Sequence, residues 1–263
     1  MKLFVCSDIH SAYTPWMKAL DEAGFDPNDD NHKIILCGDL FDRMDGSVEV
    51  YKFAMDMIKK DKLTYIVGNH EHLLMQCLER GYPYSNDFSN GTYKTICDLG
   101  EAGKGIPFDE CCVIAGEKLR PLFENMVNYW ESANYIFVHS FIPVNSEDGL
   151  PIYYVHPDRK FSKIEDWRNA DYAQWQNATW GNPFQLVKHG LLPDKILTFG
   201  HWHCSTGWAE KEGISEFGED AKFDAFYGDG YIALDSCVAH SGKINVVVIE
   251  DDLLEENNNN GSK

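Results

Sequence analysis

The sequence predicts an α/β protein in which parallel strands alternate with helices. Short apolar runs rich in β-branched residues recur along the chain, and the first three lead to the polar residues Asp8, Asp39 and Asn69. Asp39 falls 31 residues after Asp8 and Asn69 falls 30 residues after Asp39, and each interval fits one strand, helix, strand unit of roughly 30 residues. Because helical crossovers connect parallel strands, the first 70 residues predict the order β-α-β-α-β.

Five predicted strands end in side chains suited to metal or phosphate chemistry. They are the runs 3–6 before Asp8 and His10, 34–37 before Asp39 and Asp42, 63–67 before Asn69 and His70, 135–138 before His139, and 196–199 before His201 and His203. In sheet proteins with helical crossovers, the carboxyl ends of the strands face one edge, where ligands bind. We therefore expect residues almost 200 positions apart to meet in one site.

Helices are predicted where apolar residues recur at helical spacing. One such pattern covers residues 14–23, and Ser47 is expected to cap a second helix that runs through residue 59. Two further helices are expected over residues 71–80 and 117–131.

The last part of the chain predicts strands of another kind. The runs 231–235 and 243–249 alternate between apolar and polar residues, which is typical of a sheet with one solvated face. We expect them to form a second, antiparallel sheet in which a turn near Ser241 and Gly242 joins the two strands.

The candidate site residues span most of the chain without an intervening linker, so a single domain over residues 1–250 is predicted. Residues 81–131 and 145–190 look like insertions that form walls of the site. The acidic and asparagine-rich stretch 251–263 is expected to be a disordered tail.

Composition narrows the class of partner and the compartment. The 263 residues carry a formal net charge of -19, which disfavours a binder of nucleic-acid polymers or of membrane surfaces. The eight cysteines are scattered and form no CxxC motif, as in a cytoplasmic protein with reduced thiols. We expect no cleavable leader and no membrane-spanning segment, because no apolar run of 18 residues occurs.

The types of residue at the five strand ends favour a metal centre. Imidazole, carboxylate and amide oxygen together suit Mn, Fe or Zn, whereas a Mg or Ca site would use oxygen ligands alone. The set is too large for one ion, so two divalent ions are predicted. The expected ligands are Asp8, His10 and His203 for one ion, Asn69, His139 and His201 for the other, and Asp39 as a bridge between them. Such ion pairs activate a shared water and clamp a phosphoryl group.

These motifs resemble the calcineurin-like metallophosphoesterase superfamily. The segments DIH from residue 8, GDLFDR from residue 38, GNHE from residue 68, the single His139 and GHWH from residue 200 follow the family order. The resemblance implies a metallophosphoesterase fold, a four-layer αββα sandwich of two mixed β-sheets flanked by helices. It also implies the same metal ligands, and a terminal hairpin at residues 231–248.

GDLFDR followed by GNHE resembles the phosphoprotein phosphatase (serine/threonine phosphatase) branch of that superfamily. The resemblance implies that Arg43 binds the phosphate oxygens and that His70, oriented by Asp42, is a general acid toward the leaving oxygen. The chain departs from the branch pattern where other residues replace glycine, at Ser11, Met44, Ser140 and Phe141.

The resulting hypothesis is a phosphatase that hydrolyses phosphomonoesters by attack of a metal-bound hydroxide. Its substrate would be a phosphorylated small molecule or a phosphoprotein. One alternative is a phosphodiesterase or dinucleotide polyphosphate hydrolase of the same superfamily, since the pocket walls select the substrate. Another is a non-catalytic protein-binding scaffold with the same fold.

Overall fold

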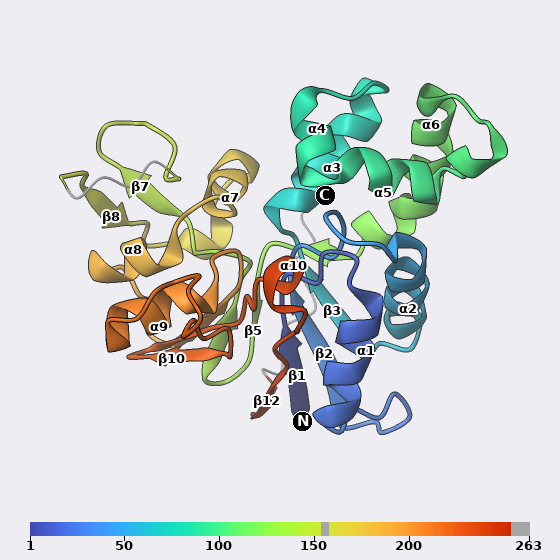
Figure 1. The fold of residues 1–263 in the computed structure, drawn as a ribbon. Coiled ribbons are helices and arrows are strands. Elements are labelled where there is room, and N and C mark those ends of the chain that lie inside the picture. The colour runs from blue at the N-terminus through green and yellow to red at the C-terminus, as the bar shows by residue number, and fades with distance from the viewer. Residues whose placement is uncertain (154–157, 254–263) are drawn as a thin grey trace.

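The computed structural model describes residues 1–153 and 158–253, in which two five-stranded sheets pack face to face between helices (Figure 1). Three apolar clusters fill the spaces between these layers. One lies between the two sheets, and the others lie between each sheet and its own helices. This four-layer mixed α/β arrangement confirms the predicted fold class.

The first sheet has the strand order β12-β1-β2-β3-β4. Its strands are β1 Lys2–Cys6, β2 His32–Cys37, β3 Leu63–Ile66, β4 Met126–Val127 and β12 Val247–Glu250. The first four run parallel to their neighbours, and β12 alone is antiparallel to β1. Helices α1 (Tyr13–Glu22) and α2 (Ser47–Lys59) make the crossovers, so the predicted β-α-β-α-β order is confirmed.

The second sheet has the strand order β10-β11-β9-β6-β5. Its strands are β5 Trp130–Glu131, β6 Tyr135–Phe137, β9 Ile196–Phe199, β10 Phe226–Gly228 and β11 Tyr231–Ala233. The three central strands β6, β9 and β11 are parallel, and both edge strands are antiparallel. A separate hairpin joins β7 Val144–Ser146 to β8 Phe161–Lys163.

The side-chain alternation of the strands explains the layers. In β1, Leu3 and Val5 face the second sheet, whereas Phe4 and Cys6 face the helices, and all four are fully buried. Successive strand residues point to opposite faces, so a strand covered on both faces is apolar throughout. Each such aliphatic side chain contributes about 1.5 to 3 kcal/mol on burial.

Helices cover the outer faces of both sheets (Figure 1). Beyond the carboxyl ends of the first sheet's strands lie α3 Asn69–Arg80, α4 Ser85–Asn90, α5 Thr92–Leu99, η1 Ala102–Lys104 and α6 Phe108–Phe123 (Figure 1). In the second half the helices are η2 Trp167–Asn169, α7 Tyr172–Ala178, α8 Pro183–Lys188 and α9 Cys204–Glu212, and the short α10 Val238–Ser241 links the sheets. No helix of the described residues is both long and apolar enough to cross a membrane.

The predicted pairing of the last two strands is wrong. β11 pairs with β9 in the second sheet, whereas β12 returns to the first sheet and pairs with β1. Ser241, expected in a hairpin turn, is the last residue of α10. Alternation identifies a strand but not its partner, and here the open edge of β1 takes β12.

Two helix predictions also need correction. The helix expected over residues 117–131 ends at Phe123, where the side chain of Asn125 donates to the carbonyl of Pro121 at 2.7 Å. The chain then enters β4 and β5. Ser47 does not cap α2, because Gly46 occupies the N-cap position and the Ser47 hydroxyl instead bonds to Ser11 Oγ at 3.0 Å.

The predicted tail lies outside the described residues from position 254 onward. Its first residue, Asp251, accepts hydrogen bonds from Ser132 Oγ at 2.6 Å and from the backbone and side chain of Asn134 at 2.8 and 2.7 Å. The ordered chain therefore continues past the predicted boundary at residue 250.

Candidate metal centre

The carboxyl ends of the parallel strands in both sheets bring the predicted site residues together. A common cavity is lined by Asp8, His10, Asp39, Arg43, Asn69, His70, His201, His203, Asp235, Cys237, Val238 and Ala239. Six of the ten non-glycine residues with positive φ in the described chain are predicted site residues, namely Asp8, His10, Asp39, Asp42, Arg43 and His201. Left-handed backbone costs about 1 to 3 kcal/mol per residue and concentrates at functional sites.

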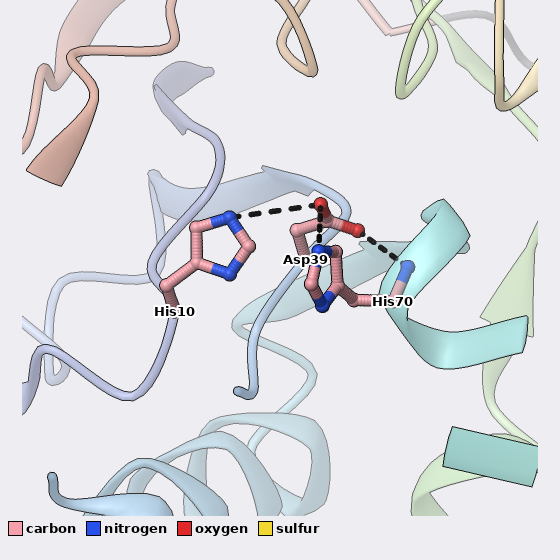
Figure 2. Close-up of side chains that lie close together, drawn as sticks. All are labelled: His10, Asp39 and His70. Carbon is pink, nitrogen blue, oxygen red and sulfur yellow. Dashed lines mark hydrogen bonds and ion pairs between the residues drawn. The ribbon is translucent and has the colours of Figure 1, made fainter. Parts of the chain in front are cut away.

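Asp39 lies at the centre of the cluster (Figure 2). Its Oδ2 is 3.7 Å from His10 Nε2 and 4.0 Å from His70 Nε2, and its Oδ1 is 3.5 Å from His139 Nε2. Oδ1 also accepts the backbone N–H of His70 at 3.0 Å. Asp39 thus belongs to both groups of side chains whose ligand atoms lie within 4.8 Å of one another, the first with His10 and His70 and the second with His139 and His201.

Glu71 fixes the loop that carries Asp39. Its fully buried carboxylate accepts the backbone N–H groups of Gly68 at 2.8 Å, Asp39 at 2.9 Å and Leu40 at 3.0 Å. These three donors come from the ends of β2 and β3, so Glu71 ties the two strand ends together.

His139, Asn69 and His201 form one side of the centre. His139 Nε2 lies 2.8 Å from Asn69 Oδ1 and 3.2 Å from His201 Nδ1. The other nitrogen, His139 Nδ1, lies 2.9 Å from the carbonyl oxygen of Cys37 and donates its proton there. A neutral imidazole that donates through Nδ1 has its lone pair on Nε2, so this nitrogen and the Asn69 oxygen converge as a cation ligand set.

Asp8 and His10 form the other side. Asp8 Oδ2 accepts from Ser7 Oγ at 2.5 Å and from the backbone N–H of His201 at 2.9 Å, which leaves Oδ1 facing His10 Nε2 at 3.9 Å. His10 Nδ1 donates to the carbonyl of Phe41 at 3.0 Å, so its Nε2 lone pair also faces the cavity.

His70, Asp42 and Arg43 lie beside these ligands. His70 Nδ1 is 2.8 Å from Asp42 Oδ2, and His70 Nε2 is 3.2 Å from Arg43 Nη2. The His70 ring stands edge-on to His10 at a centroid distance of 4.7 Å. His70 and Arg43 therefore line the cavity, and Asp42 contacts the ring nitrogen of His70 opposite Nε2.

His203 is placed less tightly than the other predicted ligands. Its side chain is 35% exposed, whereas those of Asp8, His10 and Asp39 are at most 8% exposed. The nearest carboxylate is that of Asp235, whose Oδ2 lies 3.8 Å from His203 Nε2.

Asp235 is a site residue that the sequence analysis missed. It is 4% exposed, lines the cavity and follows β11, which runs parallel to β9. The same strand-end pattern that identified Asp8 and Asp39 was present in the run 231–235. Because this run was assigned to a separate hairpin, its end was not expected beside the ends of the other parallel strands.

Burial dominates the electrostatics of the centre. It raises the pKa of Asp8 and Asp39 well above the usual range, and neighbouring carboxylates add to the shift. Burial also raises the pKa of Asp235. Burial lowers the pKa of His139 well below its usual value and lowers that of His201 to about 3. Buried carboxylates beside unprotonated imidazoles are stabilised by a bound cation, so the residues fit a metal centre.

The two sheets meet closely at Gly200, between β9 and His201. A Cβ atom at this position would lie 1.8 Å from Ser7 Oγ and 2.1 Å from Asp8 Oδ2. No side chain fits there, and the contact brings the end of β9 against the end of β1.

The chain belongs to the calcineurin-like phosphoesterase family, because the model of that family matches residues 1–241. This confirms the resemblance inferred from the motifs, and it also accounts for the two-sheet fold.

Individual relatives match smaller parts of the chain. An asymmetrical bis(5'-nucleosyl)-tetraphosphatase of Bacillus velezensis is 30% identical over 103 residues, 37% of this chain and 40% of the relative. One of Halalkalibacterium halodurans is 30% identical over 76 residues, 27% of this chain and 31% of the relative. The chain thus matches less than half the length of these curated relatives.

A solved structure extends the likeness in fold. The cold-active protein-tyrosine phosphatase of a psychrophilic Shewanella species has a TM-score of 0.53 and 16% identity, over 95% of this chain and 75% of that one. At this identity the likeness concerns the fold alone. The roles of the individual site residues, the number and identity of the ions and the cytoplasmic location remain predictions.

Proposed function

We propose that this protein is a phosphatase that hydrolyses phosphomonoesters with the help of two divalent metal ions. The observation that carries the proposal is the placement of Arg43 and His70 next to Asp39, the carboxylate common to both ligand groups. A phosphate bound at the ions would contact a guanidinium and an imidazole at the same time.

Arg43 supplies the phosphate contact. Its Nη2 atom lies 3.2 Å from His70 Nε2 at the cavity, and the planar guanidinium can hold two non-bridging oxygens at once. A dianionic monoester has more charge to match this fork than a diester has. Arg43 therefore favours a terminal phosphate.

His70 supplies the proton for the leaving oxygen. The carboxylate of Asp42 holds Nδ1 at 2.8 Å, which directs Nε2 toward the cavity. From there Nε2 can pass a proton to an alkoxide while Asp42 keeps the ring in place.

The two ions would be held by Asp39 in common, by Asn69, His139 and His201 on one side, and by Asp8, His10 and His203 on the other. When bound, such ions lower the pKa of a water and neutralise charge on the phosphoryl oxygens. Arg43, which lines the same cavity, would add its positive charge to the stabilisation of the phosphoryl oxygens.

The test is a turnover panel on metal-reconstituted protein, with phenyl phosphate, bis(p-nitrophenyl) phosphate, a phosphopeptide, a cyclic nucleotide and diadenosine tetraphosphate. We expect the monoesters to be hydrolysed fastest. Arg43→Ala should raise the activation free energy, taken from kcat/KM, by about 1.5 to 3 kcal/mol more for the monoester than for the diester. Arg43→Lys should restore part of the loss. Arg120→Ala, at an exposed arginine of α6, is the matched control.

A preference of the wild type for diesters, with an equal loss for both ester types in Arg43→Ala, would replace this proposal by the phosphodiesterase alternative. Absence of turnover on every substrate, with both ions bound, would favour the protein-binding scaffold.

The second candidate function is hydrolysis of dinucleoside polyphosphates. It is favoured by the names of the two curated relatives, which match parts of this chain at 30% identity. Here Arg43 would bind a phosphate of the chain and His70 would protonate a leaving phosphate. A kcat/KM for diadenosine tetraphosphate above that of every monoester would select this candidate.

A further inference from the structure

We propose that Thr92 and Thr95 of α5 are positioning residues that hold the Asp42 carboxylate in place for His70. The adjoining Gly91 lets the backbone of Arg43 lie close against the same segment. This inference rests on the proposed function, because it concerns the residues to which that function assigns the proton and the phosphate.

The threonine hydroxyls account for both oxygens of Asp42. Thr92 Oγ1 donates to Asp42 Oδ2 at 2.7 Å, and Thr95 Oγ1 donates to Oδ1 at 2.8 Å. Oδ2 also accepts from His70 Nδ1 at 2.8 Å. Each carboxylate oxygen therefore has a named donor, and the plane of the carboxylate is fixed.

Thr95 bonds to Asp42 twice. A hydroxyl can donate one hydrogen bond and accept others, and Thr95 Oγ1 also accepts the backbone N–H of Asp42 at 3.2 Å. Asp42, Thr92 and Thr95 are all at most 1% exposed, so water does not compete for these groups. Their loss would leave buried polar atoms without partners.

The same segment holds a strained stretch of backbone. Asp42 and Arg43 are consecutive residues with left-handed conformations, φ 75° and 63°. L-residues adopt this conformation only when the surroundings impose it. The backbone N–H of Arg43 donates to the carbonyl of Asn90 at 3.2 Å, which adds a main-chain contact to those of the threonines.

Gly91 allows the two segments to come this close. It has φ 93°, and a Cβ atom there would lie 2.4 Å from the backbone nitrogen of Arg43. Gly81 ends α3 with a similar φ of 74° but has nothing within 4 Å of a Cβ position. The two glycines differ in their contact with Arg43 and resemble each other in backbone conformation.

These contacts give the insert-like region a defined task. Helix α5 lies against the loop after β2 and directs Asp42, which directs the ring of His70. Among the described residues, the contacts given above for Asp39, His10 and His139 come from elements other than α5, so this segment supports Asp42 and Arg43.

The first experiment compares Thr92→Val, Thr95→Val and the double variant in metal-reconstituted protein. We expect kcat for phenyl phosphate to fall about tenfold to a hundredfold in the double variant, because hydrogen bonds to a charged group are lost. The loss should shrink for p-nitrophenyl phosphate, whose leaving group needs no proton. Metal content and KM should stay unchanged, and Thr95→Ser should restore activity.

Thr198→Val is the matched control. Thr198 is fully buried in β9, and its hydroxyl has no hydrogen-bond partner among the described residues. This substitution should leave kcat at the wild-type value. A loss in Thr198→Val equal to that of Thr95→Val would show a general packing effect and would overturn the inference.

A spectroscopic readout makes the inference independent of turnover. Long-range ¹H–¹⁵N correlation spectra of the metal-free protein report which ring nitrogen of each of the ten histidines carries the proton, and His70→Asn identifies the His70 signals. We expect the Nδ1–H form in the wild type and a mixture of tautomers in the double threonine variant. An unchanged His70 spectrum in that variant would overturn the inference.

The glycine pair provides the second variant set. Gly91→Ala should lower kcat/KM for phenyl phosphate at least about tenfold more than Gly81→Ala, since it alone displaces Arg43. Equal effects of the two substitutions would contradict the role of Gly91. The two proposals fail differently. Full activity of His70→Asn would refute the role of His70 as proton donor. Loss of activity in His70→Asn, together with wild-type activity of the threonine variants, would refute only the positioning role.

Discussion

The two sides of the candidate metal centre differ in how firmly their ligands are held. On the His139 side, formed by Asn69, His139 and His201, ligand atoms lie 2.8 to 3.2 Å apart around His139 Nε2. On the His203 side, formed by Asp8, His10, His203 and Asp235, the corresponding separations are 3.8 to 3.9 Å.

The difference follows from the surroundings of the two histidines. The side chain of His139 is fully buried, and its ring is anchored on the Cys37 carbonyl. The side chain of His203 is 35% exposed and stands edge-on to Phe217, which is itself half exposed. The His139 side is therefore the more buried and more closely packed of the two.

The largest effect is expected from Asp39→Asn, which should abolish the distinction between the sides. Asp39 faces both sides, so its neutralisation should lower the affinity for both ions. We expect activity to fall by roughly 10³-fold or more, beyond the typical loss when one electrostatic group is removed. Elemental analysis and kcat measure this. Retention of two ions with full activity would exclude a bridging role.

A pair of alanine substitutions tests the sides separately. His139→Ala should lower the affinity for one ion by more than the 10- to 100-fold typical of a residue that only supports a ligand, and His203→Ala by about tenfold. The reason is that the His139 ring is buried and anchored on a backbone carbonyl, whereas the His203 ring is partly exposed. Isothermal titration with Mn²⁺ or Zn²⁺ gives both affinities, and a larger loss in His203→Ala would reverse the comparison.

Asp235→Asn should affect the His203 side alone. The substitution removes a buried negative charge 3.8 Å from His203 Nε2, so we expect a roughly 10- to 100-fold lower affinity for the weaker-bound ion. Asp229→Asn is the control, because Asp229 is exposed in the turn before β11. A lower affinity for the tighter-bound ion, or an unchanged affinity for both ions, would show that Asp235 does not act on the His203 side.

The last prediction concerns stability. An ion present at 100 times its Kd should raise the free energy of unfolding by about 2.7 kcal/mol per site. Chelation should therefore lower the melting temperature in two steps, with the His203 side losing its ion first. Thermal unfolding at graded chelator concentrations measures this, and a single step would mean that the two sides bind ions as one unit.

The strand-end motifs predicted most of the site because parallel strands at a sheet edge bring distant residues together by topology alone. Asp8, Asp39 and Asn69 follow β1, β2 and β3 as expected, and His139 and His201 follow β6 and β9. The fold class and the family were predictable on the same grounds.

What the sequence did not reveal depends on pairing and on close packing. The partner of β11 decides whether Asp235 reaches the cavity, and side-chain alternation does not specify a partner strand. Thr92 and Thr95 reach Asp42 only because Gly91 lets α5 approach, and a threonine in a helix carries no sign of such a contact. The sequence also did not show that Gly46 begins α2 or that Asn125, whose side chain bonds to the carbonyl of Pro121, follows the end of α6.

The contact at Gly200 makes the distance between the two ligand sets a mechanical property of the core. The backbone N–H of His201 bonds to Asp8 at 2.9 Å, so the end of β9 cannot move away from β1 without carrying a ligand with it. Side chains between the sheets, such as Phe137 and Ile35, set how closely the layers approach. Repacking this interior is thus a route to shifting the two ligand sets relative to each other without changing any ligand.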